Sequence, residues 1–256
     1  MTTTLRAFFC QALTGLVFLG SVAAADASAF IVAPVRVTLS AKQNVAAITV
    51  TNTGTEPTLV QLETMQWSQS DGQEVLDLST AVLATPPIFT IPAGKSQIVR
   101  IGLRRAPDAN RELTYRLILR EVPPEDRSAG LHVALKISMP VFIAPVGVNA
   151  APLVQWRARH MPDGNIRVVA YNTGTAHVQF GQLEIVQAAN GKPIATHPTA
   201  DYILPANSRA WVVSPKAALP VGTMLRVSSQ TDAGKVESDV ALENDGVDTA
   251  PPTASR

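Results

Sequence analysis

The sequence predicts an all-β protein that contains two copies of one β-sandwich domain. Three observations predict this class. The 19 prolines among 256 residues fall in short clusters, such as Thr85-Pro86-Pro87, that leave little room for a long helix after residue 30. Between them lie short apolar segments punctuated by Gly and Pro, which is typical of the strands of a sandwich. Finally, two turn-and-strand signatures recur in the same order along the chain.

The first repeated signature is an Asn-Thr-Gly-Thr turn between two apolar runs, at residues 52–55 and again at residues 172–175. Glycine supplies the positive φ that a tight turn requires, and asparagine tolerates left-handed geometry. A second signature follows each turn, since residues 89–96 resemble residues 202–209 and both precede another apolar strand. Recurrence of both signatures in the same order indicates a duplicated domain.

The first 29 residues are predicted to be a secretory signal peptide. Arg6 supplies the positive charge, residues 7–25 are mostly apolar, and small residues follow, so cleavage is expected after about Ala25 or Ala29. The alternative is an uncleaved anchor helix. The single cysteine, Cys10, lies in this segment, so the mature chain is expected to contain no disulfide.

The first domain is predicted to span residues 30–145 and the second residues 152–242, with a small-residue hinge at 146–151. Residues 243–256 have little apolar surface to bury and are predicted to be a disordered tail. The strands expected in the first domain are Val32–Leu39, Val45–Asn52, Thr58–Ser68, Gln97–Leu103, Leu113–Glu121 and Leu131–Ile143.

The last of these strands carries the strongest functional signal. Leu131, Val133, Leu135 and Ile137 alternate with polar or small residues, as in a strand with one apolar face. Pro140 follows in the same run, and a strand that contains proline belongs at a sheet edge because proline has no N–H to donate. An apolar edge is an aggregation hazard, unless it binds another strand. The alternative is that the apolar face only covers a core.

Enzyme, metal and nucleic-acid functions find little support in the sequence. The four histidines show no metal-ligand spacing, and no nucleophile elbow or phosphate-binding loop is present. A net charge of +1 offers no general attraction to nucleic acid, and no second apolar stretch is long enough to span a bilayer. We therefore expect no enzyme activity, cofactor, metal or membrane-embedded segment. Trp67, Trp156 and Trp211 are expected to pack in cores, with a sugar-binding platform as the alternative.

Several motifs resemble those of the PapD-like periplasmic chaperones of the chaperone–usher pilus pathway. The most specific is Leu119-Arg120-Glu121-Val122-Pro123-Pro124, which is similar to the family's Leu-Arg-Glu-Ile-Pro-Pro motif. The resemblance implies two immunoglobulin-like β-sandwich domains in an angled, boomerang-like arrangement. The ending Pro140-Val141-Phe142 is similar to the divergent branch that serves archaic, spore-coat-like fimbriae. The other matching segments are Pro34–Val37, Asn52, Leu83–Pro87 and Ile98–Ile101.

The resemblance also implies a mechanism, donor-strand complementation, in which the chaperone lends its edge strand to a pilus subunit that lacks one. Leu131, Val133, Leu135 and Ile137 would enter the subunit's groove, with Lys136 on the same strand. In the family, an Arg and a Lys bind the subunit's C-terminal carboxylate.

Arg36 aligns with the anchoring Arg of the family, but Pro140 occupies the place of the Lys. Lys136 lies four residues away, about 13 Å along a strand, so it cannot simply replace that lysine. Arg104 and Arg116 are further candidates, with solvated surface positions as the default interpretation. The carboxylate anchor is therefore either reduced to Arg36 or built differently.

Thr85–Pro86 is a candidate cis peptide, with trans as the default.

The function expected is that of a periplasmic, non-enzymatic chaperone that binds pilus or fimbrial subunits and delivers them to an outer-membrane usher. Self-association through the edge strand is a further expectation when no subunit is bound. The alternatives are a secreted structural or adhesive two-sandwich pilus component, with an incomplete sandwich, and a carbohydrate-binding module.

Overall fold

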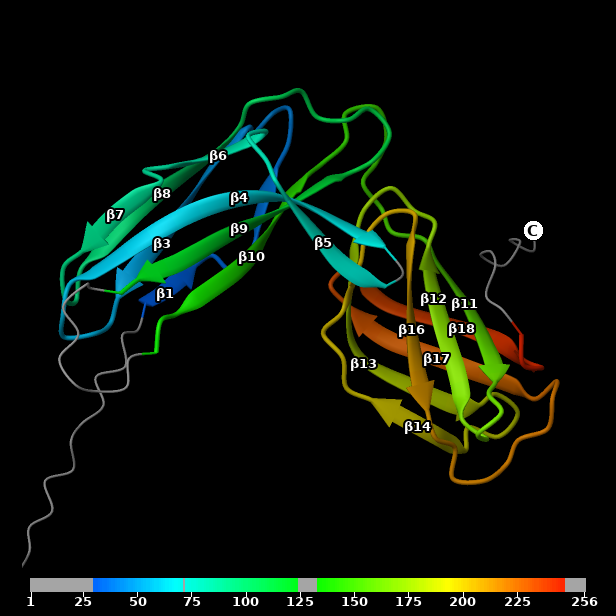
Figure 1. The fold of residues 1–256 in the computed structure, drawn as a ribbon. Coiled ribbons are helices and arrows are strands. Elements are labelled where there is room, and N and C mark those ends of the chain that lie inside the picture. Colours follow the sequence, from blue (N-terminus) through cyan, green and yellow to red (C-terminus); the bar gives the residue numbers. More distant parts are fainter. Residues whose placement is uncertain (1–29, 71, 124–132, 247–256) are drawn as a thin grey trace, which may run out of the picture.

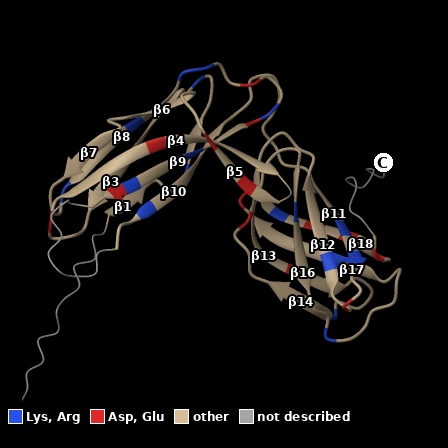
Figure 2. Ribbon diagram, in the orientation of Figure 1, with Lys and Arg blue, Asp and Glu red and all other residues tan. Residues whose placement is uncertain are grey.

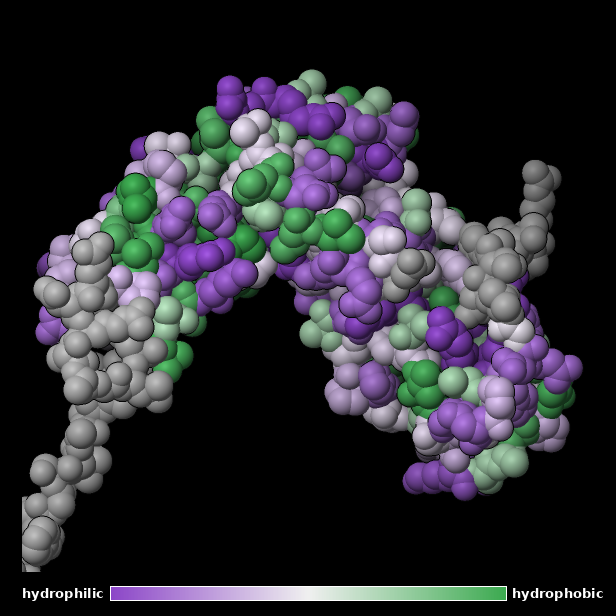
Figure 3. Space-filling view, in the orientation of Figure 1, coloured by the Kyte–Doolittle hydropathy of each residue, from purple (hydrophilic) through white to green (hydrophobic). Residues whose placement is uncertain are grey.

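The computed structural model describes residues 30–70, 72–123 and 133–246, which form strands β1 to β18. The strands fall into an N-terminal half, β1–β10, and a C-terminal half, β11–β18, which meet at an angle (Figure 1). The space-filling view shows the same bend (Figure 3). The described residues contain no helix of the length and apolar character that crossing a membrane requires.

The N-terminal half is a sandwich of two sheets. One sheet has the order β1-β3-β8-β6, and the other has the order β2-β10-β9-β4-β5, with β7 paired to β4. Alternate residues of both sheets point inward and bury an aliphatic core that includes Val50, Val99, Leu117 and Val141. The strands are β1 (Phe30–Ala33), β2 (Val37–Leu39), β3 (Val45–Asn52), β4 (Thr58–Ser70), β5 (Gln73–Leu78), β6 (Val82–Thr85), β7 (Ile88–Ile91), β8 (Ser96–Leu103), β9 (Leu113–Val122) and β10 (Lys136–Ile143).

The C-terminal half has the strand order β14-β13-β17-β18-β11-β12-β16, with β15 paired to β13. β11 joins β18 in parallel at only two positions, Ala158 and Arg159, so these strands connect two layers that enclose a second core. The strands are β11 (Val154–His160), β12 (Ile166–Asn172), β13 (Val178–Gln187), β14 (Pro193–His197), β15 (Tyr202–Ile203), β16 (Asn207–Val213), β17 (Met224–Thr231) and β18 (Gly234–Glu243).

The structure corrects the expected strand Val32–Leu39, which is two strands in different sheets. β1 pairs with β3, whereas β2 pairs in parallel with β10. The chain changes sheets at Pro34, which cannot donate to a ladder and follows a cis peptide bond. The Thr85–Pro86 bond is also cis. β3 has the predicted bounds, whereas β5, β6 and β7 were not predicted.

The repeated Asn-Thr-Gly-Thr turn makes three equivalent asparagine hydrogen bonds in both halves. The buried Asn52 amide donates to Glu56 O (2.7 Å) and Ile91 O (2.9 Å), and its Oδ1 accepts from Gly54 N–H (2.8 Å). The buried Asn172 donates to the corresponding carbonyls of Ala176 (2.7 Å) and Ile203 (3.0 Å) and accepts from Gly174 N–H (3.0 Å). The sequence repeat is therefore a structural repeat.

A hydrophobic cluster at the bend joins the two halves. Trp67 of β4 and Phe142 of β10 are buried against Leu204 of the C-terminal half, and Tyr202 of β15 packs beside them. The Trp67 and Tyr202 rings meet edge to face, with centroids 5.3 Å apart. Gln69 adds hydrogen bonds to the same strand, because its side chain donates to Tyr202 O and accepts from Leu204 N–H.

Candidate functional site

β10 has one paired side and one side that is open over half its length. β9 pairs with it from Lys136 to Ile143, whereas β2 pairs only with Val141–Ile143. Within the described part of the chain, residues 136–140 therefore have no strand on the β2 side. These residues form an open sheet edge, which ends where β2 begins to pair with β10 at Val141.

The position of Pro140 fits this edge. Glu121 N–H donates to Leu135 O across the β9–β10 ladder (2.9 Å), and the ladder continues without a register shift. Because antiparallel pairs alternate, the odd-numbered residues of β10 bond to β9 and the even-numbered residues direct their backbone groups away from it. The missing N–H of Pro140 thus faces the open side, as the sequence predicted for a proline at an edge.

The apolar face of β10 continues beyond the N-terminal core. Met139 is buried in that core, and Leu135 and Ile137 pack partly against it. Val133, which precedes the strand, is 64% exposed. The apolar row thus changes from buried to exposed towards residue 133. Leu131 lies outside the described residues.

The expected strand Leu131–Ile143 begins only at Lys136 in the structure. Val133–Leu135 form no strand, because the pairing strand β9 ends at Val122 and the Leu135 N–H binds the Glu121 carboxylate (3.0 Å) in place of a backbone carbonyl. Lys136 is exposed and lies opposite Arg120. It is therefore on the open edge and not at the bend.

Arg36, which aligns with the anchoring Arg of the family, lies at the bend, just before β2. Its guanidinium donates to Asp232 Oδ2 (2.7 Å) and to Gln179 Oε1 (2.8 Å), both in the C-terminal half. Its side chain is 34% exposed. Burial works against its charge, but Tyr202 and Asp232 more than offset this, so the pKa of Arg36 lies above its usual value.

A histidine between two carboxylates extends this contact. His177 Nδ1 lies 2.7 Å from Glu112 Oε1, and His177 Nε2 lies 3.2 Å from Asp232 Oδ2, the oxygen that also binds Arg36. Burial works against the charge of His177, but these two carboxylates outweigh it and raise the pKa of His177. Burial likewise opposes ionisation of Asp232, yet hydrogen bonds from His177, Gln179 and Arg36 lower its pKa to about 2.

Arg116 is the second cation near the bend, and it is not the solvated residue that the sequence suggested. It lies directly opposite Pro140 in the β9–β10 ladder, beside the position where the family lysine was expected. Its guanidinium is 3.7 Å from the Trp67 ring centroid and bonds to Glu74 (2.5 Å), with only 10% of its side chain exposed. Arg104, by contrast, is exposed at the end of β8.

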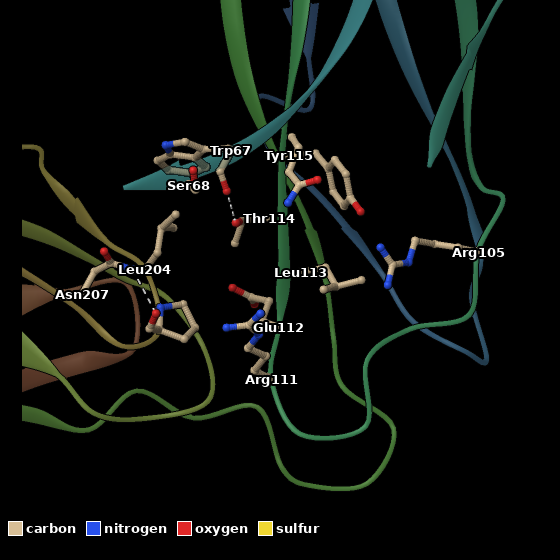
Figure 4. A pocket seen from close by; sticks show the side chains of 12 residues that line it. Trp67, Ser68, Arg105, Arg111, Glu112, Leu113, Thr114, Tyr115, Leu204 and Asn207 are labelled. Atoms are coloured by element: carbon tan, nitrogen blue, oxygen red, sulfur yellow. Dashed lines mark hydrogen bonds between the residues drawn. The ribbon is translucent and has the colours of Figure 1, made fainter. Parts of the chain in front are cut away.

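Two pockets lie between the halves. One, of about 130 Å³, is lined by β9 and its preceding loop on one side and by Leu204 and Asn207 on the other (Figure 4). The other, of about 450 Å³, lies between the β4–β5 hairpin, Arg116 and Arg209. Neither pocket holds a nucleophile–base pair, and no cluster that could hold a metal occurs among the described residues.

Charge and aromatic exposure do not suggest another kind of site. Lys and Arg are interspersed with Asp and Glu over both halves in the view drawn (Figure 2). Trp67, Trp156 and Trp211 are each at most 5% exposed. Since a stacking platform for sugars needs an exposed ring, their burial counts against a carbohydrate-binding module.

Comparison with known proteins identifies the family. Residues 29–149 match the model of the pili and flagellar-assembly chaperones, PapD N-terminal domain. The whole fold, covering 85% of this chain and 100% of the other, is similar to the chaperone in the Acinetobacter baumannii CsuC–CsuE chaperone–tip adhesion subunit complex (TM-score 0.62, 17% identity). Over residues 29–149, the chain belongs to the PapD-like chaperones. This family is non-enzymatic, and it acts in pilus assembly by the chaperone–usher pathway.

Other PapD-like chaperones show the same two-domain fold. The Pseudomonas aeruginosa CupB2 chaperone has a TM-score of 0.56 and 20% identity, and the alignment covers 83% of this chain and 100% of CupB2. The SafB chaperone, solved with the Salmonella enterica SafA pilin, has a TM-score of 0.55 and 19% identity, with 84% and 96% covered. No curated protein matches the sequence.

Proposed function

We propose that this PapD-like chaperone acts in the periplasm, lends the segment Leu131–Ile137 to a pilus subunit, and delivers that subunit to an outer-membrane usher. The observation that supports the proposal most directly is the open side of β10 next to an apolar row that becomes exposed at Val133. Residues 1–29 would serve as the cleaved signal peptide that exports the chain.

The lent strand would bind through two kinds of contact. Its backbone groups at residues 136 and 138 face the open side and can pair with a subunit strand whatever the sequence of that strand. Its apolar side chains, Leu131, Val133, Leu135 and Ile137, would fill successive pockets in the subunit. Each aliphatic side chain contributes about 1.5–3 kcal/mol when fully buried. Four would contribute about 6–12 kcal/mol before the costs of association.

Arg36 would anchor the C-terminal carboxylate of the subunit. It is partly exposed at the bend, and a guanidinium can bind two carboxylates at once because it has five N–H donors. Arg116 would add positive potential beside Pro140, where the family lysine is missing. The proposed anchor therefore combines Arg36, which is partly exposed, with Arg116, whose guanidinium packs against the Trp67 ring.

The partner class follows from the relatives. The similar chaperones were solved with a tip adhesion subunit and with a pilin, as the CsuC–CsuE and SafA–SafB complexes. The same class of partner, a pilus or fimbrial subunit, is proposed for this chain. A structural or adhesive pilus component would have an incomplete sandwich, whereas the N-terminal half here contains its own last strand, β10, paired with β9 and β2.

The proposal is tested by placing charge on the apolar row. Val133→Glu is the cleanest change, because Val133 is exposed and contributes little to the fold. We expect the variant to fold normally but to lose co-purification with a co-expressed pilus subunit, by at least about tenfold, since a carboxylate would enter an apolar pocket. Ala134→Glu is the matched control on the opposite face. If Val133→Glu retains the subunit as well as Ala134→Glu does, strand lending through this row is wrong.

A further inference from the structure

The contact between Arg36 and Asp232 places a carboxylate of the protein itself on the arginine proposed to anchor the subunit. Asp232 lies in the turn between β17 and β18, in the C-terminal half, and Arg36 lies before β2. A subunit carboxylate that binds Arg36 must share this guanidinium with Asp232. The affinity of Arg36 for the subunit carboxylate therefore depends on whether a second positive charge, on the far side of Asp232, offsets the negative charge of Asp232.

His177 is the group on that other side. Both of its ring nitrogens lie within hydrogen-bonding distance of ionised carboxylates, which are only acceptors, so both contacts are hydrogen bonds only when the ring is protonated. When the ring is neutral, it can donate to one carboxylate and presents a lone pair to the other. Glu112 is the more buried of the two carboxylates, and it already accepts a hydrogen bond from the backbone N–H of His177 (3.1 Å). Glu112 therefore keeps the ring proton, and Asp232 is then bound only by the Arg36 guanidinium and the Gln179 backbone N–H (2.8 Å).

The ring is fixed in this position by packing. The Phe142 ring of β10 stacks on His177 with centroids 3.4 Å apart and an angle of 6° between the planes, and the Tyr202 ring lies 5.8 Å away. The charged and titratable groups that face His177 are thus Glu112, Asp232 and, through Asp232, Arg36, with Tyr202 beside them. When His177 is protonated, the two carboxylates, Arg36 and His177 together carry no net charge. When His177 is neutral, the same four side chains carry a net charge of −1.

We propose that His177 and Asp232 are positioning residues that make Arg36 a pH-dependent carboxylate site, which binds a peptide C-terminus more tightly when His177 is protonated. This inference rests on the proposed anchoring role of Arg36. Because the two carboxylates raise the pKa of His177, the change in affinity lies at a higher pH than the titration of an ordinary histidine. The ligand class is a carboxylate at the end of a peptide chain.

The size of the effect follows from one unit of charge at a short distance. The incoming carboxylate would bind Arg36 on the side away from Asp232, several ångströms from His177, in a partly solvated site. One added positive charge at that distance is expected to change the dissociation constant by about three- to tenfold.

The experiment uses the full-length mature protein and N-acetylalanine, a small molecule that carries one carboxylate in a C-terminal setting. Its binding is followed by NMR through the carbon-bound methyl signals of Val37, the neighbour of Arg36 that every variant retains, from about pH 6 to about pH 9. We expect its dissociation constant to rise about three- to tenfold across the titration of His177, whose ring signals report the protonation in the same samples. The uncharged N-acetylalaninamide should not bind Arg36 at any pH.

Variants separate the inference from the proposed function. His177→Gln should remove the pH dependence of N-acetylalanine binding. Asp232→Asn should tighten this binding and make it nearly independent of pH. His160 lies outside the cluster, so His160→Gln should leave the pH dependence unchanged. Asp232→Asn keeps the test valid if His177→Gln does not fold. Binding that depends on Arg36 but not on pH, or a slope that persists in His177→Gln, overturns the inference alone. Identical behaviour of the wild type and Arg36→Ala at every pH overturns the Arg36 anchor itself, and the inference with it.

Discussion

Two asparagines show how a single residue type can organise both halves of this molecule. Asn52 and Asn172 are buried, and each uses its amide to hold two backbone carbonyls and its oxygen to hold a glycine N–H. The sequence predicted both turns, because Asn and Gly at this spacing have known local preferences. The long-range bonds to Ile91 and Ile203 could not be predicted, since those residues lie about thirty to forty positions away and carry no matching side-chain signal.

Replacing Asn52 by alanine should destabilise the N-terminal half strongly. The change removes three hydrogen bonds and leaves the carbonyls of Glu56 and Ile91 without their donor. We expect the free energy of unfolding to fall by about 2–4 kcal/mol, as measured by denaturant unfolding. The exposed Asn44 is the control, and Asn44→Ala should cost less than about 0.5 kcal/mol. Equal losses in the two variants would contradict this role for Asn52.

The residues at the bend divide into those with a sequence signal and those without. Arg36 was expected from its resemblance to a family motif, and the structure places it at the bend. His177, Glu112 and Asp232 were not expected to form a cluster, because each has an ordinary local context and the three come together only when the two halves pack. Arg116 was expected on the surface, since nothing local shows that Trp67 covers it.

At the scale of elements, β10 combines a feature that periodicity predicts with one that it cannot. The alternation of apolar residues predicted the strand, and Pro140 predicted its edge position. The start of the strand at Lys136 depends on where its partner β9 ends and on the Glu121 carboxylate, which are tertiary effects. The missed strand β5 has no buried residue on either face and hence no clear hydrophobic period.

Hydrogen exchange should report the open side of β10. The amides of Ile137 and Met139 point towards β9 and should exchange slowly, whereas those of Lys136 and Ser138 point away from it and should exchange quickly. On binding of a pilus subunit, we expect the amides of Lys136 and Ser138 to become protected by at least about tenfold, measured by NMR. Protection of only the odd-numbered amides in the complex would show that the subunit does not pair with this edge.

At the scale of the whole molecule, the sequence repeat predicted two sandwiches, and the family resemblance predicted the angle between them. The contacts that hold the angle could not be predicted, because Trp67, Phe142 and Leu204 come from three distant parts of the chain. Phe142 is central to these contacts. It lies on the face of β10 opposite the N-terminal core, and it contacts both the aromatic cluster and His177.

Truncating Phe142 should loosen the bend. Phe142→Ala removes the ring that packs against Trp67, Tyr202 and His177, and we expect a broader distribution of molecular shapes with a larger mean radius of gyration by small-angle X-ray scattering. Phe180→Ala is the control, since Phe180 is buried in the C-terminal core. It should cost about 3–5 kcal/mol of stability without changing the shape of the folded protein. A shape change in Phe180→Ala alone would contradict this assignment.

The linker between the halves, residues 144–153, is held by backbone hydrogen bonds to both halves. Val146 and Gly147 donate to the carbonyls of Asp108 and Ala109 in the N-terminal half, and Thr175 N–H donates to Ala151 O in the C-terminal half. Gly174 lies so close to the linker that a Cβ there would come within 2.4 Å of Ala151 O, so only glycine fits.

The second Asn-Thr-Gly-Thr turn therefore also binds the linker between the two halves, which the first turn does not. Besides closing its own sandwich, Asn172 accepts from Leu153 N–H, and the Thr175 hydroxyl donates to Asn149 O. The stretch from residue 149 to residue 153 thus belongs to the C-terminal folding unit although it precedes the first strand of that unit. Anyone who wishes to produce the C-terminal sandwich by itself should begin the expressed fragment ahead of Asn149, because a cut at Pro152 would remove backbone that the turn is built to hold.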